Sequence, residues 1–113
     1  MTERKRWISV PKDSKAKNDL FEFKATKEQL IEIELTQNEF DVLYDNCIFS
    51  QINNVCFKLL DDYEEEVIEN ENDLIAIIEI LKNAKHIDDK LISDLLHLAE
   101  SALKFKTGMF FYF

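Results

Sequence analysis

The sequence predicts a single α+β domain, in which a small and mostly antiparallel sheet packs against about three helices. The 113 residues match the usual size of one domain, and a hydrophobic content of 46% with nine phenylalanines is sufficient for a packed core. Apolar residues recur with a period of two in some stretches and at helical spacing in others. One glycine and one proline are too few for the many tight hairpins of an all-β sandwich or barrel.

The domain covers residues 1–113, and we expect residues 1–19 to be loosely ordered. Within them, residues 7–10 are predicted to form a short strand, and the polar run from Lys12 to Asp19 is predicted to form a loop.

Two stretches then alternate between apolar and charged side chains. Residues 20–26 place Phe21 and Phe23 on one side, and residues 30–35 place Glu32 and Glu34 opposite their apolar neighbours. A period of two is typical of half-buried strands. We therefore expect these two strands to pair as a hairpin.

Three helices are predicted from their caps and apolar spacing. Thr36 precedes Glu39 by three residues, which is a capping box, and it begins a helix over residues 37–52. Asn72 or Asp73 caps a helix that ends near Lys82. Asp88 caps the last helix, which ends near Lys104, with acids at its start and lysines at its end that suit the helix dipole.

The remaining stretches carry weaker or different signals. Residues 55–60 fit either a short strand or a helical turn, and we favour the strand. Residues 61–71 are predicted to be irregular or helical, with inward anchors at Tyr63, Val67 and Ile68. After the break at Thr107-Gly108, residues 109–113 have no polar face, so this strand is expected inside the sheet, covered by helices.

The negative charge of the chain is concentrated in its middle. Between Glu28 and Glu79 there are fifteen Asp and Glu and one cation, Lys58, whereas the chain as a whole has a net charge of −9. The densest part, residues 61–73, is called the acidic segment below. We predict that its eight carboxylates bind a partner: Asp61, Asp62, Glu64, Glu65, Glu66, Glu69, Glu71 and Asp73.

Several classes of function find little support in the sequence. His97 is expected to face solvent and Cys47 and Cys56 the core, so no Cys-His pair for nucleophilic catalysis is expected. The acidic segment lacks the Asp-x-Asp-x-Asp-Gly pattern of a calcium loop. We expect no enzyme activity, no metal and no cofactor. Clustered cations for nucleic-acid binding are limited to residues 4–6.

The cellular location of the protein is predicted from its apolar runs and its cysteines. The longest apolar run, residues 74–78, is far shorter than the roughly 20 residues that a membrane span needs. No signal peptide is visible, and two cysteines among apolar neighbours are typical of reduced core thiols. A cytoplasmic protein without membrane contact is predicted.

The acidic segment allows three interpretations. It is a solubilising face, or it repels nonspecific association, or it recognises a basic partner. In the third case the carboxylates take the positions of nucleic-acid phosphates and also speed the encounter with a cationic surface.

Three stretches carry a resemblance to a known class of proteins: LTQNEFDVLYDNCIFSQIN (35–53), DDYEEEVIENENDLIAIIEIL (61–81) and GMFFYF (108–113). Together they resemble small bacterial immunity proteins of contact-dependent-inhibition and other polymorphic toxin systems. The acidic segment favours a basic, nuclease-type toxin domain, and the resemblance implies a noncatalytic inhibitor that neutralises a cognate toxin in the cytoplasm. It assigns no binding residue, so the eight carboxylates rest on charge alone. The alternatives are an acidic nucleic-acid-mimicking inhibitor or regulator of phage or host origin and, after it, a carboxylate- or metal-dependent enzyme.

Overall fold

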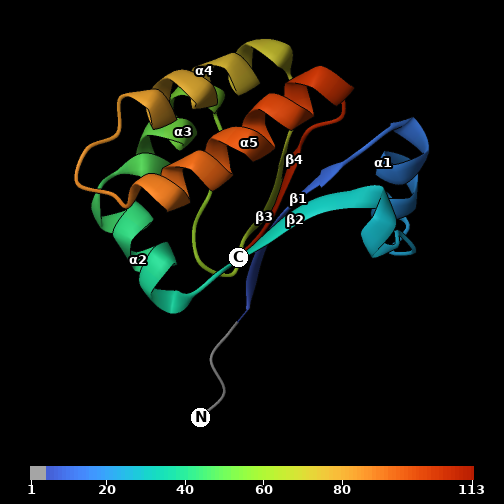
Figure 1. The fold of residues 1–113 in the computed structure, drawn as a ribbon, viewed down its shortest axis with the longest axis horizontal. Helices are drawn as coiled ribbons and strands as arrows, with labels where there is room; N and C mark the ends of the chain where they lie inside the picture. The colour runs from blue at the N-terminus through green and yellow to red at the C-terminus, as the bar shows by residue number, and fades with distance from the viewer. Residues whose placement is uncertain (1–4) are drawn as a thin grey trace.

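In the computed structural model, which describes residues 5–113, four antiparallel strands form one sheet in the order β2-β1-β4-β3, and five α-helices pack around it (Figure 1). The predicted α+β class with a single domain is confirmed. In chain order the elements are β1 (Arg6–Pro11), α1 (Ser14–Phe21), the 3-10 turn η1 (Lys27–Gln29), β2 (Leu30–Leu35), α2 (Gln37–Asp45), α3 (Ile48–Cys56), β3 (Glu65–Ile68), α4 (Glu71–Lys82), α5 (Asp89–Phe105) and β4 (Met109–Tyr112).

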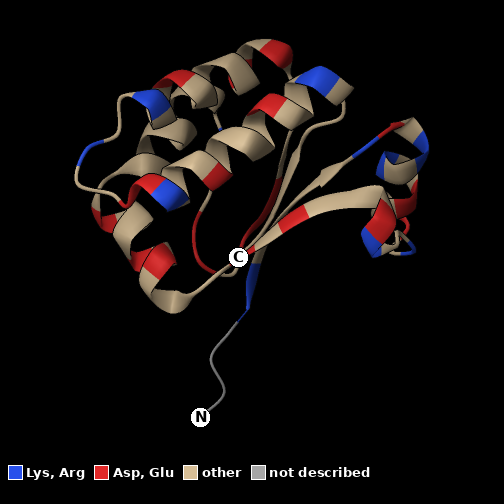
Figure 2. Ribbon diagram, viewed as in Figure 1, with Lys and Arg blue, Asp and Glu red and all other residues tan. Residues whose placement is uncertain are grey.

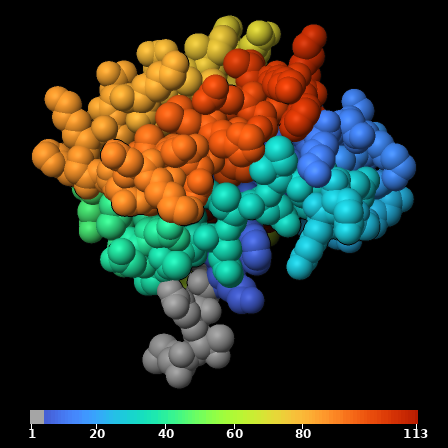
Figure 3. All heavy atoms as spheres, viewed as in Figure 1, coloured from blue at the N-terminus to red at the C-terminus, as the bar shows by residue number. Residues whose placement is uncertain are grey.

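The helices divide unequally between the two faces of the sheet. Helices α2 to α5 form one layer over one face, while α1 and the residues after it form a separate lobe on the other side (Figures 1 and 3). Met109, Phe111 and Phe113 lie in the main core beneath the large layer. Phe110 points the other way, where its ring centroid lies 5.1 Å from that of Phe21. The predicted burial of the last strand inside the sheet is therefore confirmed.

The N-terminal third differs most from its prediction. Residues 1–4 lie outside the described part, and β1 occupies an interior position of the sheet, between β2 and β4. The predicted loop over residues 12–19 is instead mostly α1, because the Asp13 carboxylate accepts a hydrogen bond from the Ala16 backbone and caps the helix. Residues 20–26 are not a strand, and β2 pairs with β1 along six residues.

The middle of the chain is more broken than predicted. The Thr36–Glu39 capping box is confirmed, but the helix ends at Asp45 and restarts at Ile48, because Cys47 has a left-handed backbone with φ of 64°. Cys47 is therefore exposed, Cys56 is buried, and both thiols are free. The strand favoured over residues 55–60 is wrong, since α3 continues to Cys56 and ends at Phe57, which is also left-handed.

The C-terminal third follows its prediction closely. Asp88 caps α5 as predicted, and Asn70 caps α4, two or three residues before the predicted cap at Asn72 or Asp73. Gly108 has φ of 137°, and an added Cβ would lie 3.0 Å from the Ile68 carbonyl oxygen and from the Glu69 Cβ. A side chain at this position would be both strained and crowded. The sole glycine therefore lets the chain turn from α5 into β4 beside β3.

Phe113 and Phe23 form a matched pair for testing this arrangement. The ring of Phe113 contacts the rings of Phe40, Phe49 and Phe111 at centroid distances of 5.1–5.7 Å, while Phe23 is 87% exposed. Phe113→Ala is expected to lower the free energy of unfolding by about 3–5 kcal/mol, because it leaves a cavity. Phe23→Ala is expected to change it by less than about 0.5 kcal/mol. Urea unfolding measures both values, and equal midpoints would contradict this account of the core.

Candidate functional site

The acidic segment contains β3, which is an edge strand of the sheet. Register with β4 pairs Glu65 with Tyr112 and Val67 with Phe110, so Glu65 and Val67 share the face on which α1 lies. Glu66 and Ile68 belong to the opposite set, and Ile68 is fully buried. Successive side chains on a strand point to opposite faces, so this segment does not present its carboxylates as a single surface. Figure 2 shows the acidic loop that leads into β3.

One predicted binding carboxylate, Asp62, pairs with a buried arginine, Arg6. The Nη2 and Nε of Arg6 donate hydrogen bonds of 2.8 and 3.1 Å to Asp62 Oδ1, and Nη1 donates one of 2.8 Å to Gln37 Oε1. The same guanidinium lies 4.2 Å from the centre of the Phe40 ring. Arg6 is 2% exposed, so its charge requires a partner. Asp62 supplies the compensating charge and ties the loop before β3 to β1 and α2.

Two further carboxylates are paired with lysines. Glu66 lies 3.8 Å from the Lys58 ammonium, and Glu69 lies 2.5 Å from that of Lys17. Their charge is therefore partly neutralised within the molecule.

The other predicted residues lie apart from one another. Asp61 accepts a hydrogen bond from the Asp62 backbone, and Glu64 is half-buried, with its carbonyl oxygen bound to the Phe113 N–H. Glu71 and Asp73 lie in the first turn of α4, where carboxylates stabilise the helix dipole. Tyr63, predicted to anchor the segment, is 77% exposed with a left-handed backbone.

Glu65 belongs instead to a surface that the sequence did not single out. The sheet face not covered by α2 to α5 is called the open face. One row across its four strands reads Glu34, Trp7, Tyr112 and Glu65. The two glutamates at the ends are exposed and the two rings between them are half-buried. Three strand spacings place the backbones of the two edge strands about 14 Å apart.

The second row of the open face reads Glu32, Ser9, Phe110 and Val67. The Ser9 hydroxyl donates a hydrogen bond of 2.5 Å to Glu32 Oε2, and α1 covers Phe110. The open face thus has aromatic rings in its middle and carboxylates along both edges.

These carboxylates also affect the pKa of the Tyr112 phenol. Burial raises the pKa of the Tyr112 phenol to about 12, and the negative charges of Glu65 and Glu32 contribute in the same direction. Carboxylates from both edge strands therefore act on the middle of the open face.

The sequence analysis did not predict that Glu32, Glu34 and Trp7 lie on the same face of the sheet as Glu65. The alternation over residues 30–35 already places both glutamates on the solvent side of one strand. The binding residues were predicted from charge density alone, which is highest in the acidic segment and lower in β2. Their position beside Trp7 depends on the β1–β2 register, which needs the structure.

The described part of the chain was also searched for metal sites and for membrane-spanning helices. Within residues 5–113 there is no group of three or more His, Cys, Asp or Glu side chains arranged to hold a metal ion. Among the same residues, no helix combines the length and apolar character needed to cross a membrane.

Asp62→Asn is expected to destabilise the fold by about 2–4 kcal/mol, because it leaves the buried Arg6 guanidinium without a compensating charge. Asp61→Asn is the matched control, since it removes a neighbouring carboxylate and keeps a side-chain oxygen that can accept from the Asp62 backbone. Chemical denaturation of both variants makes the comparison. A loss for Asp62→Asn no larger than that for Asp61→Asn would show that Arg6 is stabilised by other contacts.

The raised pKa of Tyr112 leads us to expect that the stability of the fold depends on pH. Its phenol keeps its proton up to a pKa of about 12 in the folded state, against 10.0 without the protein environment. The unfolded chain therefore loses this proton first as pH rises, and stability falls between pH 10 and 12. Tyr112→Phe is expected to remove this part of the decline, while Tyr44→Phe on α2 is expected to retain it. Urea midpoints measured from pH 8 to 11.5 test both expectations.

The fold is similar to that of a solved structure, the Neisseria DNA mimic protein DMP12. The TM-score is 0.71 at 18% sequence identity, and the match covers 97% of this chain and 100% of that chain. At this identity the likeness shows a shared fold. No protein-family model matches the chain, and no curated protein matches it either.

This likeness corrects the predicted partner. The sequence predicts a cognate toxin domain as the partner, with no nucleic acid; that prediction is contradicted, because the solved structure with a similar fold is a DNA mimic protein. The resemblance to immunity proteins stays a prediction without support from the comparisons.

Proposed function

We propose that this chain is a DNA mimic, which presents carboxylates in place of phosphates and occupies the DNA-binding surface of a basic protein. The observation that carries the proposal is the row of the open face with glutamates at both edges, in a fold that a DNA mimic shares. Fold likeness alone does not assign a function, so the proposal depends on the charges of this chain.

The spacing of the carboxylates suits this role. Glu32 and Glu34 are two residues apart on β2, which corresponds to about 6.8 Å along an antiparallel strand. The two edges of the open face, about 14 Å apart, compare with a major groove about 12 Å wide. The separation of the two charged edges is therefore close to the width of that groove.

The distribution of charge favours a protein partner that itself binds DNA. The open face bears glutamates, which repel phosphate, and the fifteen acids between Glu28 and Glu79 carry the surplus negative charge of the chain. Such a field attracts a cationic surface and raises the rate of encounter. Binding of this kind needs no reaction and no cofactor.

Two double variants with the same change in net charge test the proposal. Glu34→Lys with Glu65→Lys reverses both ends of the open-face row. Glu79→Lys with Glu100→Lys reverses two exposed glutamates on α4 and α5. A panel of purified basic DNA-binding domains, each bound to a fluorescent duplex, is titrated with the wild type and each variant at low and high salt.

The wild type is expected to displace the duplex from at least one domain of the panel. The open-face variant is expected to need about tenfold more protein, because two attractive charges become repulsive, and the helix variant is expected to stay near the wild type. Thermal melts confirm that both variants fold. Equal losses in the two variants would reduce the effect to net charge, and a wild type that displaces no duplex would refute the mimicry.

A further inference from the structure

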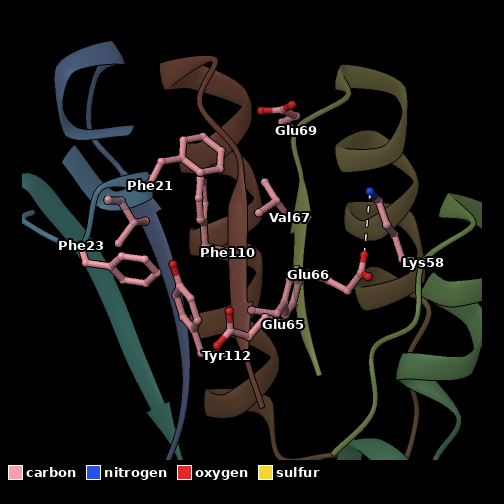
Figure 4. Close-up of a pocket in the computed structure, with 11 residues that line it drawn as sticks. Phe21, Phe23, Lys58, Glu65, Glu66, Val67, Glu69, Phe110 and Tyr112 are labelled. Atoms are coloured by element: carbon pink, nitrogen blue, oxygen red, sulfur yellow. Dashed lines mark ion pairs between the residues drawn. The ribbon is translucent and has the colours of Figure 1, made fainter. Parts of the chain in front are cut away.

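A groove of about 440 Å³ lies between α1 and β3, at one end of the open face (Figure 4). Phe21 and Phe23 of the α1 lobe form one wall, while Phe110, Val67 and Tyr112 line the side that the sheet provides. This lining is apolar and aromatic, in contrast to the charged edges around it.

Three glutamates also line this groove, and they differ in their partners. Glu66 is paired with Lys58, on the other side of β3 from the phenylalanines (Figure 4). Glu69 is paired with Lys17. Among the described residues, Glu65 has no cationic partner. Its carboxylate lies beside the Tyr112 ring (Figure 4), as expected for residues directly opposite each other on paired strands. Glu65 is therefore the carboxylate of the groove that is available to an external cation.

The Phe23 ring lies at the mouth of the groove in an unusual backbone setting. Phe23 follows the end of α1 with φ of 59°, a left-handed conformation that glycine adopts without strain. Its side chain is nevertheless 87% exposed. A large exposed ring on a strained backbone contributes little to the core, and it leaves an aromatic face open to a ligand.

We propose that this groove receives an arginine side chain of the DNA-binding partner. The guanidinium stacks on the Phe23 or Tyr112 ring and pairs with Glu65, and the aliphatic stem packs on the half-buried Val67. Arginine suits the site better than lysine, because its planar group stacks on rings and pairs with a carboxylate at the same time. The inference rests on the proposed function for the source of the arginine, but the chemistry of the groove is testable separately.

The probes are the capped tripeptides acetyl-Gly-Arg-Gly-amide, its lysine analogue and its citrulline analogue, which keeps the shape of arginine without its charge. Each is titrated into the full chain, and the aromatic proton resonances are followed by NMR. The arginine peptide is expected to shift the resonances of Phe23 and Tyr112. The lysine peptide is expected to bind more weakly, and the citrulline peptide is expected to shift neither ring.

Matched variants then assign the effect to the groove. Phe23→Ala is expected to weaken binding of the arginine peptide about threefold, and Phe57→Ala is expected to leave it unchanged, since Phe57 is equally exposed and left-handed but lies outside the groove. Glu65→Gln is expected to weaken binding about three- to tenfold, and Glu79→Gln on α4 is expected to have no effect.

The inference is overturned if the arginine peptide leaves both rings unshifted, if citrulline binds as well as arginine, or if Phe57→Ala weakens binding as much as Phe23→Ala. The outcome is distinct from the duplex-displacement test. Arginine binding without displacement would retain the groove and refute the mimicry, and displacement without arginine binding would do the reverse.

Discussion

The structure depends on covering a strand that has no polar face. β4 lies between β1 and β3 and directs Met109, Phe111 and Phe113 to one side of the sheet and Phe110 and Tyr112 to the other. Burial of such rings is a large favourable term in folding, so both sides need a cover. Helices α2 to α5 supply the first, and the eight-residue α1 supplies part of the second.

The incomplete cover explains why the candidate site lies where it does. α1 protects Phe110 but leaves Tyr112 and Trp7 half-exposed, and the edge strands add their glutamates on either side. On the other side of the sheet, the buried Arg6 guanidinium holds the partly exposed Asp62 and so fixes the loop before β3. The negative charge of this chain therefore divides between carboxylates that stabilise the fold and carboxylates that remain exposed.

Local signals in the sequence predicted more than long-range ones. The capping box at Thr36 and the cap at Asp88 depend on residues three positions apart, and both were predicted correctly. Residues 20–26 alternate as a strand does, but β1 provides the pairing edge for β2, and sequence alone does not show which segment pairs. Similarly, nothing near Asp62 in the sequence shows that Arg6, 56 positions away, neutralises it. The open face required strand register, which is long-range information of the same kind.

The interior position of β4 also affects how the chain is made. Protein synthesis releases β1 and β2 first, and they can pair long before residues 109–112 leave the ribosome. Until then the edge of β1 over residues 7–9, which later pairs with β4, is unpaired, and such an edge promotes association between chains. An unfinished chain also lacks Tyr112 and therefore the middle of the open face. Truncated chains are therefore expected to associate more readily than the chain with a complete sheet.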